Sequence, residues 1–260
     1  MVNQDTVFHR SQPAVRRIGM HDVWDALAKG IDDFRAMPSH AVFLCAIYPV
    51  IGLVLGRLTF GLELLPMLFP LAAGFALIGP FAALGLYELS RRRELGMEIS
   101  AWEAMGVLTS RASVPIAELG AMLLFIFVAW LVAAQAIYAM TFGDSVPASI
   151  SEFARDVFTT DRGWALLLIG NGVGFLFAVA AFSLSVVSFP MVLDRGASPA
   201  EAVATSLRVV AVNPKTMAAW GLIIAAALAI GTLPFFIGLI LVLPVLGHAS
   251  WHLYRKLVPH

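Results

Sequence analysis

The chain has 260 residues, of which 60% are hydrophobic and only 13% are charged. Ordinary globular proteins are about 45–50% apolar and about 25% charged, so this composition argues against a soluble domain and excludes a disordered chain. The seventeen basic and seventeen acidic residues cancel, which leaves no basic surplus to bind nucleic acid. The lipid bilayer is therefore the expected environment.

Six apolar runs follow a polar N-terminal arm that contains no signal-peptide pattern. Each run is long enough to cross a bilayer as a helix, and none shows the alternation of barrel strands. We predict an all-α membrane protein with six transmembrane helices and both termini on the same side. The predicted spans are 41–60, 64–89, 116–141, 164–193, 216–233 and 234–253.

The loop cations orient these spans. Fourteen of the seventeen Lys and Arg residues lie on the side that holds both termini, and three lie on the other side. Cytoplasmic loops carry an excess of positive charge, so both termini are predicted to be cytoplasmic in a multi-pass membrane protein.

Three polar-to-apolar transitions share one pattern, in which a capping residue is followed three positions later by an acid and then, before the span, by a proline. We predict three repeats, each an interfacial helix followed by a helical hairpin. Chance similarity among amphipathic connectors is the alternative. The capping residues are Asp22, Ser100 and Ser198, and the prolines are Pro38, Pro115 and Pro214. The chain is thereby divided into an N-terminal arm at 1–19 and repeats at 20–97, 98–195 and 196–260.

Two segments outside the spans have amphipathic spacing. Trp24, Leu27, Ile31 and Phe34 share one face of the first repeat's short helix, which is expected to lie in the cytoplasmic interface with this face apolar. In the outer loop 142–163, the capping pair Ser149 and Glu152 precedes Ile150, Phe153 and Val157 on one face. This pattern predicts a short helix on the outer surface, or alternatively a substrate lid.

Small residues recur three or four positions apart in the fourth span. They predict a smooth stripe on which another helix packs closely, and a second, weaker pair lies in the first span. The stripe contains Gly170, Gly174, Ala178 and Ala181, and the weaker pair is Gly52 and Gly56.

Polar residues within the spans are the candidate intramembrane sites. Asn171 is the first candidate, because a buried amide in lipid must find partners or line a wet cavity. Glu118, Gln135 and Tyr138 of the third span could meet it. Such a group would form either a transporter-like polar pathway or structural hydrogen bonds between helices.

His248 and His252 are spaced i, i+4, which places both imidazoles on one helical face, and Glu88 is a candidate third ligand. The alternative is an interfacial belt in which Trp251 and Tyr254 anchor the chain at headgroup depth. We favour the belt and predict neither a metal nor another cofactor.

No nucleophile elbow, Walker loop, dinucleotide fingerprint, CxxC pair or HExxH motif occurs in the sequence. We therefore expect a protein that is not an enzyme.

Three segments carry a family resemblance: WDALAKGIDDF, GPFAALGLYELSRRRELG and LPVLGHASWHLYRKLV. With the six-span pattern, they resemble the uncharacterised bacterial integral membrane family called domain of unknown function 2189. Some of its members are labelled cytochrome c oxidase subunit I. This sequence does not support that label, because only two of its histidines, His248 and His252, lie in a predicted span, and both lie at its end. The resemblance implies the bacterial inner membrane and carries over no activity.

Together these features predict a non-enzymatic polytopic protein. Its expected role is transport of a small or lipid-like molecule through a cavity lined by Asn171, Gln135 and the fourth-span serines, or support of a membrane complex. The support role would involve a membrane-protein partner or a homo-oligomer. The alternative function is that of a metal- or haem-binding accessory protein of a respiratory complex.

Overall fold

The structure is a computed structural model that describes residues 13–45, 66–67, 69–71, 79, 83–100, 104, 106–143, 147–233 and 237–259. Within these residues the regular secondary structure is all helical, with no strand, as predicted. The helices are α1 (Met20–Ala36), α2 (Pro38–Cys45), α6 (Leu84–Glu94), the 3-10 helix η2 (Gly106–Thr109), α8 (Ser113–Phe142), α9 (Ile150–Thr159), α10 (Asp161–Ser185), α11 (Ser188–Arg195), α12 (Pro199–Val212), α13 (Pro214–Thr232) and α14 (Leu239–Leu257).

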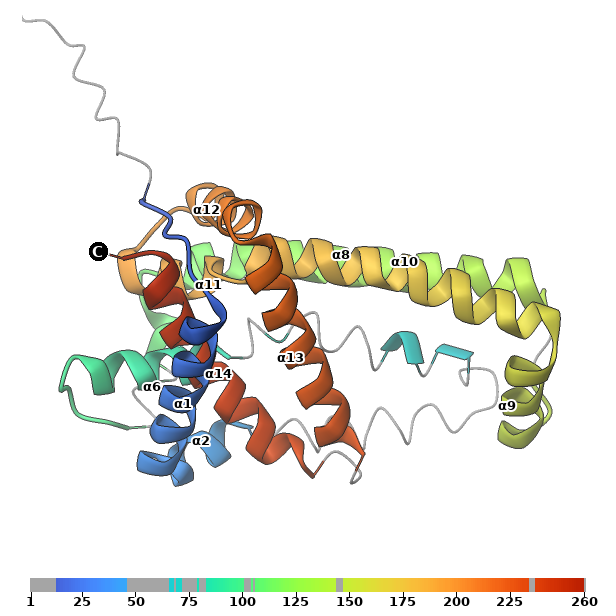
Figure 1. The fold of residues 1–260 in the computed structure, drawn as a ribbon, viewed down its shortest axis with the longest axis horizontal. Helices are drawn as coiled ribbons and strands as arrows, with labels where there is room; N and C mark the ends of the chain where they lie inside the picture. Colours follow the sequence, from blue (N-terminus) through green and yellow to red (C-terminus); the bar gives the residue numbers. More distant parts are fainter. Residues whose placement is uncertain are drawn as a thin grey trace, which may run out of the picture.

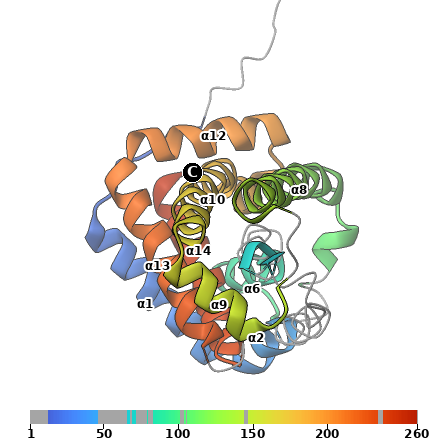
Figure 2. The ribbon, with the colours of Figure 1, turned by 90° about the vertical axis from the view of Figure 1, so that its right-hand side faces the viewer.

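Two long helices dominate the shape of the molecule. Helices α8 and α10 run side by side away from a compact group of helices, and α9 lies at their far end (Figure 1). We call the compact group, formed by α1, α2, α6, α11, α12 and α14, the head, and we call the opposite end the α9 end. Figure 2 looks from the α9 end along the hairpin toward the head.

Three candidate membrane spans are found among the described helices: Ser113–Phe142, Asp161–Arg195 and Pro214–Thr232. They coincide with the predicted third, fourth and fifth spans. Their side chains are widely exposed, including Phe125 at 75% and Leu222 at 71%. Exposed apolar side chains on this scale are costly in water and favourable in hydrocarbon, so these helices are suited to a bilayer.

The other predicted spans are not established as spans. Most of 41–60 and 64–89 lies outside the described residues. Helix α14 covers most of 234–253, but it is not among the candidate spans. Its second half is enclosed by protein, with Trp251, Tyr254 and Leu257 at most 1% exposed, and it ends in the charged Arg255 and Lys256.

Capping explains where the short helices begin. Ser198 is the N-cap of α12, and its hydroxyl accepts a hydrogen bond from the Glu201 amide at 3.3 Å, as the sequence pattern predicts. In α1 the pattern is displaced: Gly19 is the N-cap, and Asp22 accepts from the Gly19 amide at 3.0 Å. Asp22 is therefore the third residue of the helix rather than its cap, and the threefold repeat remains a prediction.

Helix α1 packs against α14 through a face other than its predicted apolar stripe. Val23, Ala26, Gly30 and Asp33 are buried, and α1 lies mainly against α14. Trp24, which belongs to the stripe, is 59% exposed, and the interfacial position of this stripe stays a prediction. The close approach of Gly30 to α14 fixes the rotation of the helix: a Cβ at Gly30 would lie 2.7 Å from the Ala249 amide nitrogen.

Asn213 joins the N-terminal segment to the turn between α12 and α13. Its Oδ1 accepts from the Ile18 amide at 2.9 Å, and its Nδ2 donates to the Arg16 carbonyl at 3.1 Å. The Arg16 amide in turn donates to the Leu257 carbonyl at 2.9 Å. These bonds place the beginning and the end of the described chain together in the head.

Replacing Asn213 by alanine is expected to release this segment, because the Ile18 amide and the Arg16 carbonyl lose a buried partner at a cost of about 1–3 kcal/mol. Hydrogen exchange should accelerate at Ile18. Asn213→Asp retains the acceptor for Ile18 and loses the donor to Arg16, so it should give an intermediate exchange rate. Unchanged exchange in both variants would contradict this role.

Candidate functional site

A pocket of about 370 Å³ lies at the α9 end, between α8, α9, α10 and residues 66, 67, 69 and 70. The amphipathic helix α9 closes one side of it. The predicted helix in the outer loop is confirmed: the Ser149 hydroxyl caps it by accepting from the Glu152 amide at 3.1 Å. Phe153 and Val157 of α9 line the pocket, so the apolar face that the sequence predicted for this helix contributes its wall.

Aromatic side chains hold this end together. The rings of Tyr138 and Phe142 stack with centroids 5.4 Å apart, and Phe153 packs obliquely on both. The Arg162 guanidinium lies over the Phe142 ring at 4.7 Å and pairs with Asp156 at 2.6 Å. These contacts anchor α9 to the ends of α8 and α10 and thereby keep the wall in place.

The pocket is almost entirely apolar. Its polar lining residues are Tyr138 and Asn171, together with Trp130, whose indole N–H already donates to the Pro70 carbonyl at 2.9 Å. The Asn171 Nδ2 donates to the Leu167 carbonyl at 2.8 Å, one turn earlier in α10. An apolar cavity with one or two polar groups is suited to an apolar ligand that carries a single polar feature.

The described residues do not assemble the predicted polar pathway. Asn171 and Tyr138 line the same pocket, but Asn171 is exposed and is not the buried amide that the sequence suggested. Gln135 and Glu118 are also exposed, and they line no part of the pocket. The fourth-span serines are absent from the lining as well: Ser185 donates to the Ala181 carbonyl and Ser188 to the Leu184 carbonyl. The cavity is therefore apolar where a polar route was expected, because helix rotation points Gln135 away from α10.

The small residues of α10 have different environments. Gly174 lies against the Trp130 ring, where an added Cβ would be 3.0 Å from Cη2, and Ala181 is buried. Gly170 lines the pocket with open space above it, and Ala178 is exposed. Gly52 and Gly56 lie outside the described residues. The stripe thus serves packing at Gly174 and Ala181 and cavity space at Gly170.

A second polar site lies in the head, where α1, α6 and α14 meet. Asp33 is 3% exposed and accepts hydrogen bonds from the Ser90 hydroxyl at 2.5 Å, from His252 Nε2 at 2.8 Å and from Arg93. Ser90 also contacts His248 Nδ1 at 2.7 Å. We call Asp33, Ser90, Arg93, His248 and His252 the buried polar cluster.

Asp33 is ionised in this setting. Burial by itself raises the pKa of Asp33, but the hydrogen bonds from His252 and Ser90, the charge of His252 and the hydrogen bond from Arg93 lower it to about 2. An ionised carboxylate accepts hydrogen bonds and donates none, so it fixes the direction of every bond in the cluster.

The histidine pair therefore meets a different acid from the one proposed. His248 and His252 are brought together with Asp33, whereas Glu88 pairs with Arg91 and Arg92 at 3.1 and 2.8 Å. No group of three or more His, Cys, Asp or Glu side chains in the described part of the chain is arranged to hold a metal ion. The sequence signal for Asp33 was its spacing of 3, 7 and 10 residues from Gly30, Ala26 and Val23, which places all four on one helical face.

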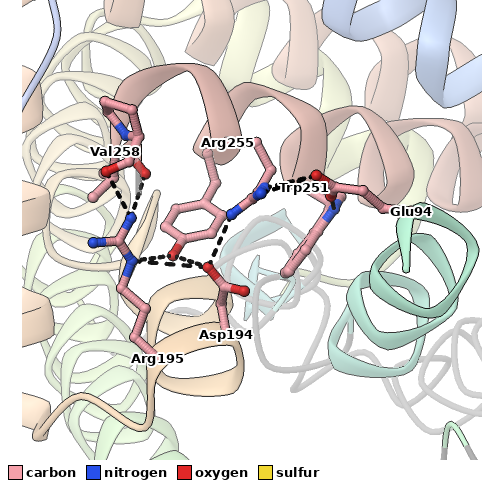
Figure 3. Close-up of polar contacts among 8 residues, drawn as sticks. Glu94, Asp194, Arg195, Trp251, Arg255 and Val258 are labelled. Atoms are coloured by element: carbon pink, nitrogen blue, oxygen red, sulfur yellow. Dashed lines mark hydrogen bonds and ion pairs between the residues drawn. The ribbon is translucent and has the colours of Figure 1, made fainter.

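Charged groups beside this cluster tie three helices together (Figure 3). Arg255 of α14 donates to Glu94 of α6 at 3.0 Å and to Asp194 of α11 at 3.3 Å. The Tyr254 hydroxyl donates to Asp194 at 2.7 Å, and the Trp251 indole donates to Glu94 at 3.0 Å. The interfacial belt expected for Trp251 and Tyr254 is wrong, because these rings are buried among helices instead of facing lipid headgroups.

The comparisons with known proteins agree with the helical, apolar character of the chain. No curated protein and no solved structure matches it. Residues 68–194, which include α6, α8, α9, α10 and most of α11, match the family described as Predicted integral membrane protein (DUF2189). This match covers most of the residues that line the pocket and confirms the resemblance found in the sequence. Residues 68–194 are thus similar to a family of predicted integral membrane proteins.

Proposed function

We propose that this membrane protein binds a lipid-like molecule in the pocket at the α9 end and takes part in its transport, without enzymatic activity. The pocket itself carries the proposal. Its volume of about 370 Å³ lies within the usual range of about 300–1,000 Å³ for small-molecule sites. A hydrocarbon chain gains from burying its surface there, while Asn171 and Tyr138 offer polar contact.

The position of the pocket supports a ligand that comes from the bilayer. It lies between two candidate spans whose outer surfaces are apolar, with Leu168 of α10 71% exposed beside the lining residue Leu167. A lipid-like molecule could therefore move from the surface of α10 into the pocket without crossing a polar layer. Helix α9, which crosses this end, would cover it.

The proposal also includes the location and orientation of the protein in the membrane. We place the protein in the bacterial inner membrane with six spans and both termini in the cytoplasm, supported by the cation bias of the loops. In this orientation both termini and the charged C-terminal end of α14 lie on the cytoplasmic side, and the pocket lies toward the outer leaflet. The scaffold role, with a membrane-protein partner or a second copy of the chain, remains an alternative outcome of the test.

A substitution that fills the pocket separates specific binding from general contact with lipid. An added Cβ meets nothing within 4 Å at either Gly170 or Gly172, and only Gly170 lines the pocket. With vesicles containing a phospholipid that carries a diazirine on one acyl chain, Gly170→Leu should reduce labelling of the pocket residues about tenfold, equivalent to ~1.4 kcal/mol. Peptide mass spectrometry would measure the label.

Gly172→Leu is the matched control, because it has the same effect on helix propensity and leaves the pocket unchanged. Labelling of the exposed Leu168 should stay constant in both variants and reports ordinary contact with lipid. Equal labelling of the pocket in the two variants would overturn the proposal. Pocket labelling without transfer of a fluorescent lipid across reconstituted vesicles would retain binding and favour the scaffold role over transport.

A further inference from the structure

The buried polar cluster in the head has an unusual proton balance. Ser90 has one hydroxyl proton and lies within hydrogen-bond distance of two groups, Asp33 Oδ2 at 2.5 Å and His248 Nδ1 at 2.7 Å. The ionised Asp33 carboxylate has no proton to give, so the Ser90 hydroxyl must donate to it. Ser90 then has only lone pairs for His248, and His248 Nδ1 must carry a hydrogen and donate to Ser90.

This tautomer leaves the other ring nitrogen without a proton. In a neutral imidazole only one nitrogen carries hydrogen, so Nε2 of His248 presents a lone pair. That atom is buried in a side chain that is 0% exposed, and no donor in the described part of the chain reaches it. A buried acceptor without a donor is costly, of order 1–3 kcal/mol, and the cluster is therefore one proton short of a fully bonded network.

We infer that His248 Nε2 is a proton-binding site that sets the charge at the junction of α1, α6 and α14. A hydronium ion transfers its proton to the Nε2 lone pair: one O–H bond breaks, one N–H bond forms and a water molecule is released. The imidazolium keeps its Nδ1–H bond to Ser90, and the backbone of Leu86 is close enough to favour the new proton. Occupation of this site therefore raises the net charge of the cluster by one.

The surrounding charges set the conditions for this uptake. Asp33, 3.9 Å from His248, favours the proton, while burial, Arg93 and His252 oppose it, so occupation requires acidic pH. The other charged groups on the helices packed against α14 are held in separate pairs or are exposed. They are Asp22 and Asp25 with Lys256, Glu88 with Arg91 and Arg92, Glu94 and Asp194 with Arg255, Arg195 with Tyr254, His40 with Ser39, and the exposed Asp32, Arg35, Lys29, His21 and Lys215.

Nitrogen NMR of the full chain, labelled with ¹⁵N-histidine and held in lipid nanodiscs, tests this inference. At neutral pH, His248 should be the Nδ1–H tautomer, and acidification should protonate Nε2 while the protein stays folded. His248→Gln should remove one titrating imidazole, whereas the exposed His21→Gln leaves the His248 signals in place. If His248→Gln does not fold, substituting the other histidines one at a time assigns its signals by elimination.

Ser90→Ala removes the group that selects the tautomer. His248 in that variant should lose its preference for Nδ1–H, as should His248 in Asp33→Asn, whose amide can donate to Ser90 and release the hydroxyl for His248. An Nε2–H tautomer in the unmodified protein would overturn the inference. An unchanged tautomer in Ser90→Ala, or a His248 that takes no proton before the protein unfolds, would overturn it as well.

Discussion

Replacing Asp33 by alanine is expected to lower the free energy of unfolding by about 3 kcal/mol, the lower end of the range for breaking a buried ion pair. Asp33 of α1 accepts hydrogen bonds from Ser90 and Arg93 of α6 and from His252 of α14, so two helices lose their common acceptor. The loss stays at the low end because the Arg93 side chain is 39% exposed and regains water. Unfolding of the purified protein in mild detergent measures the effect.

Asp32→Ala is the matched control, since this neighbouring carboxylate is exposed on the same helix. It should change stability by less than about 0.5 kcal/mol.

The pH dependence of the stability gives a second check on Asp33. The pKa of Asp33 is lowered to about 2, so its stabilisation is fully present above the usual carboxylate value of 3.8 and is lost as pH falls from there toward 2. If the unmodified protein were still more stable than Asp33→Ala below pH 2, the stabilisation would not come from an ionised carboxylate.

Gly30→Ala is expected to destabilise the head by about 2 kcal/mol, although alanine favours a helix over glycine by about 1 kcal/mol. An added Cβ would lie 2.7 Å from the Ala249 amide nitrogen and 2.8 Å from the Val245 carbonyl oxygen. Both atoms belong to the backbone of α14, so no side chain can rotate away, and α1 must move off α14. The same unfolding measurement in detergent detects the loss.

The control for Gly30 is a glycine with open space. Gly172 lies within α10, and a Cβ there meets nothing within 4 Å. Gly172→Ala should therefore be neutral or stabilising by up to about 1 kcal/mol, opposite in sign to Gly30→Ala. Equal effects at the two positions would show that helix propensity, and not the contact between α1 and α14, determines the result.

Hydropathy and local capping were readable from the sequence because they depend on near neighbours. The third, fourth and fifth predicted spans coincide with candidate membrane-spanning helices, since about 20 consecutive apolar residues have few alternatives to a helix in lipid. Ser149 and Ser198 cap helices as the spacing to Glu152 and Glu201 predicts. The helix at 150–159 and its apolar face followed from the same local pattern.

Helix rotation was decided by tertiary packing. Gly30 turns α1 so that Asp33 is buried and Trp24 is exposed, whereas amphipathic spacing alone did not indicate which face of α1 packs on protein. Helix rotation also keeps Gln135 of α8 out of the pocket that Asn171 of α10 lines, although the two helices are neighbours. A helical periodicity allows several overlapping faces, and the closest backbone approach selects one of them.

The sequence by itself thus determined that this protein is helical, that it is suited to a membrane and that residues 68–194 match a family of predicted integral membrane proteins. Only the tertiary structure decided what its polar residues do. Asp33 is 57 residues from Ser90 and 219 from His252, and such pairings arise from how helices dock, which no local pattern encodes. The pocket at the α9 end likewise exists only because α8, α9, α10 and residues 66, 67, 69 and 70 come together there.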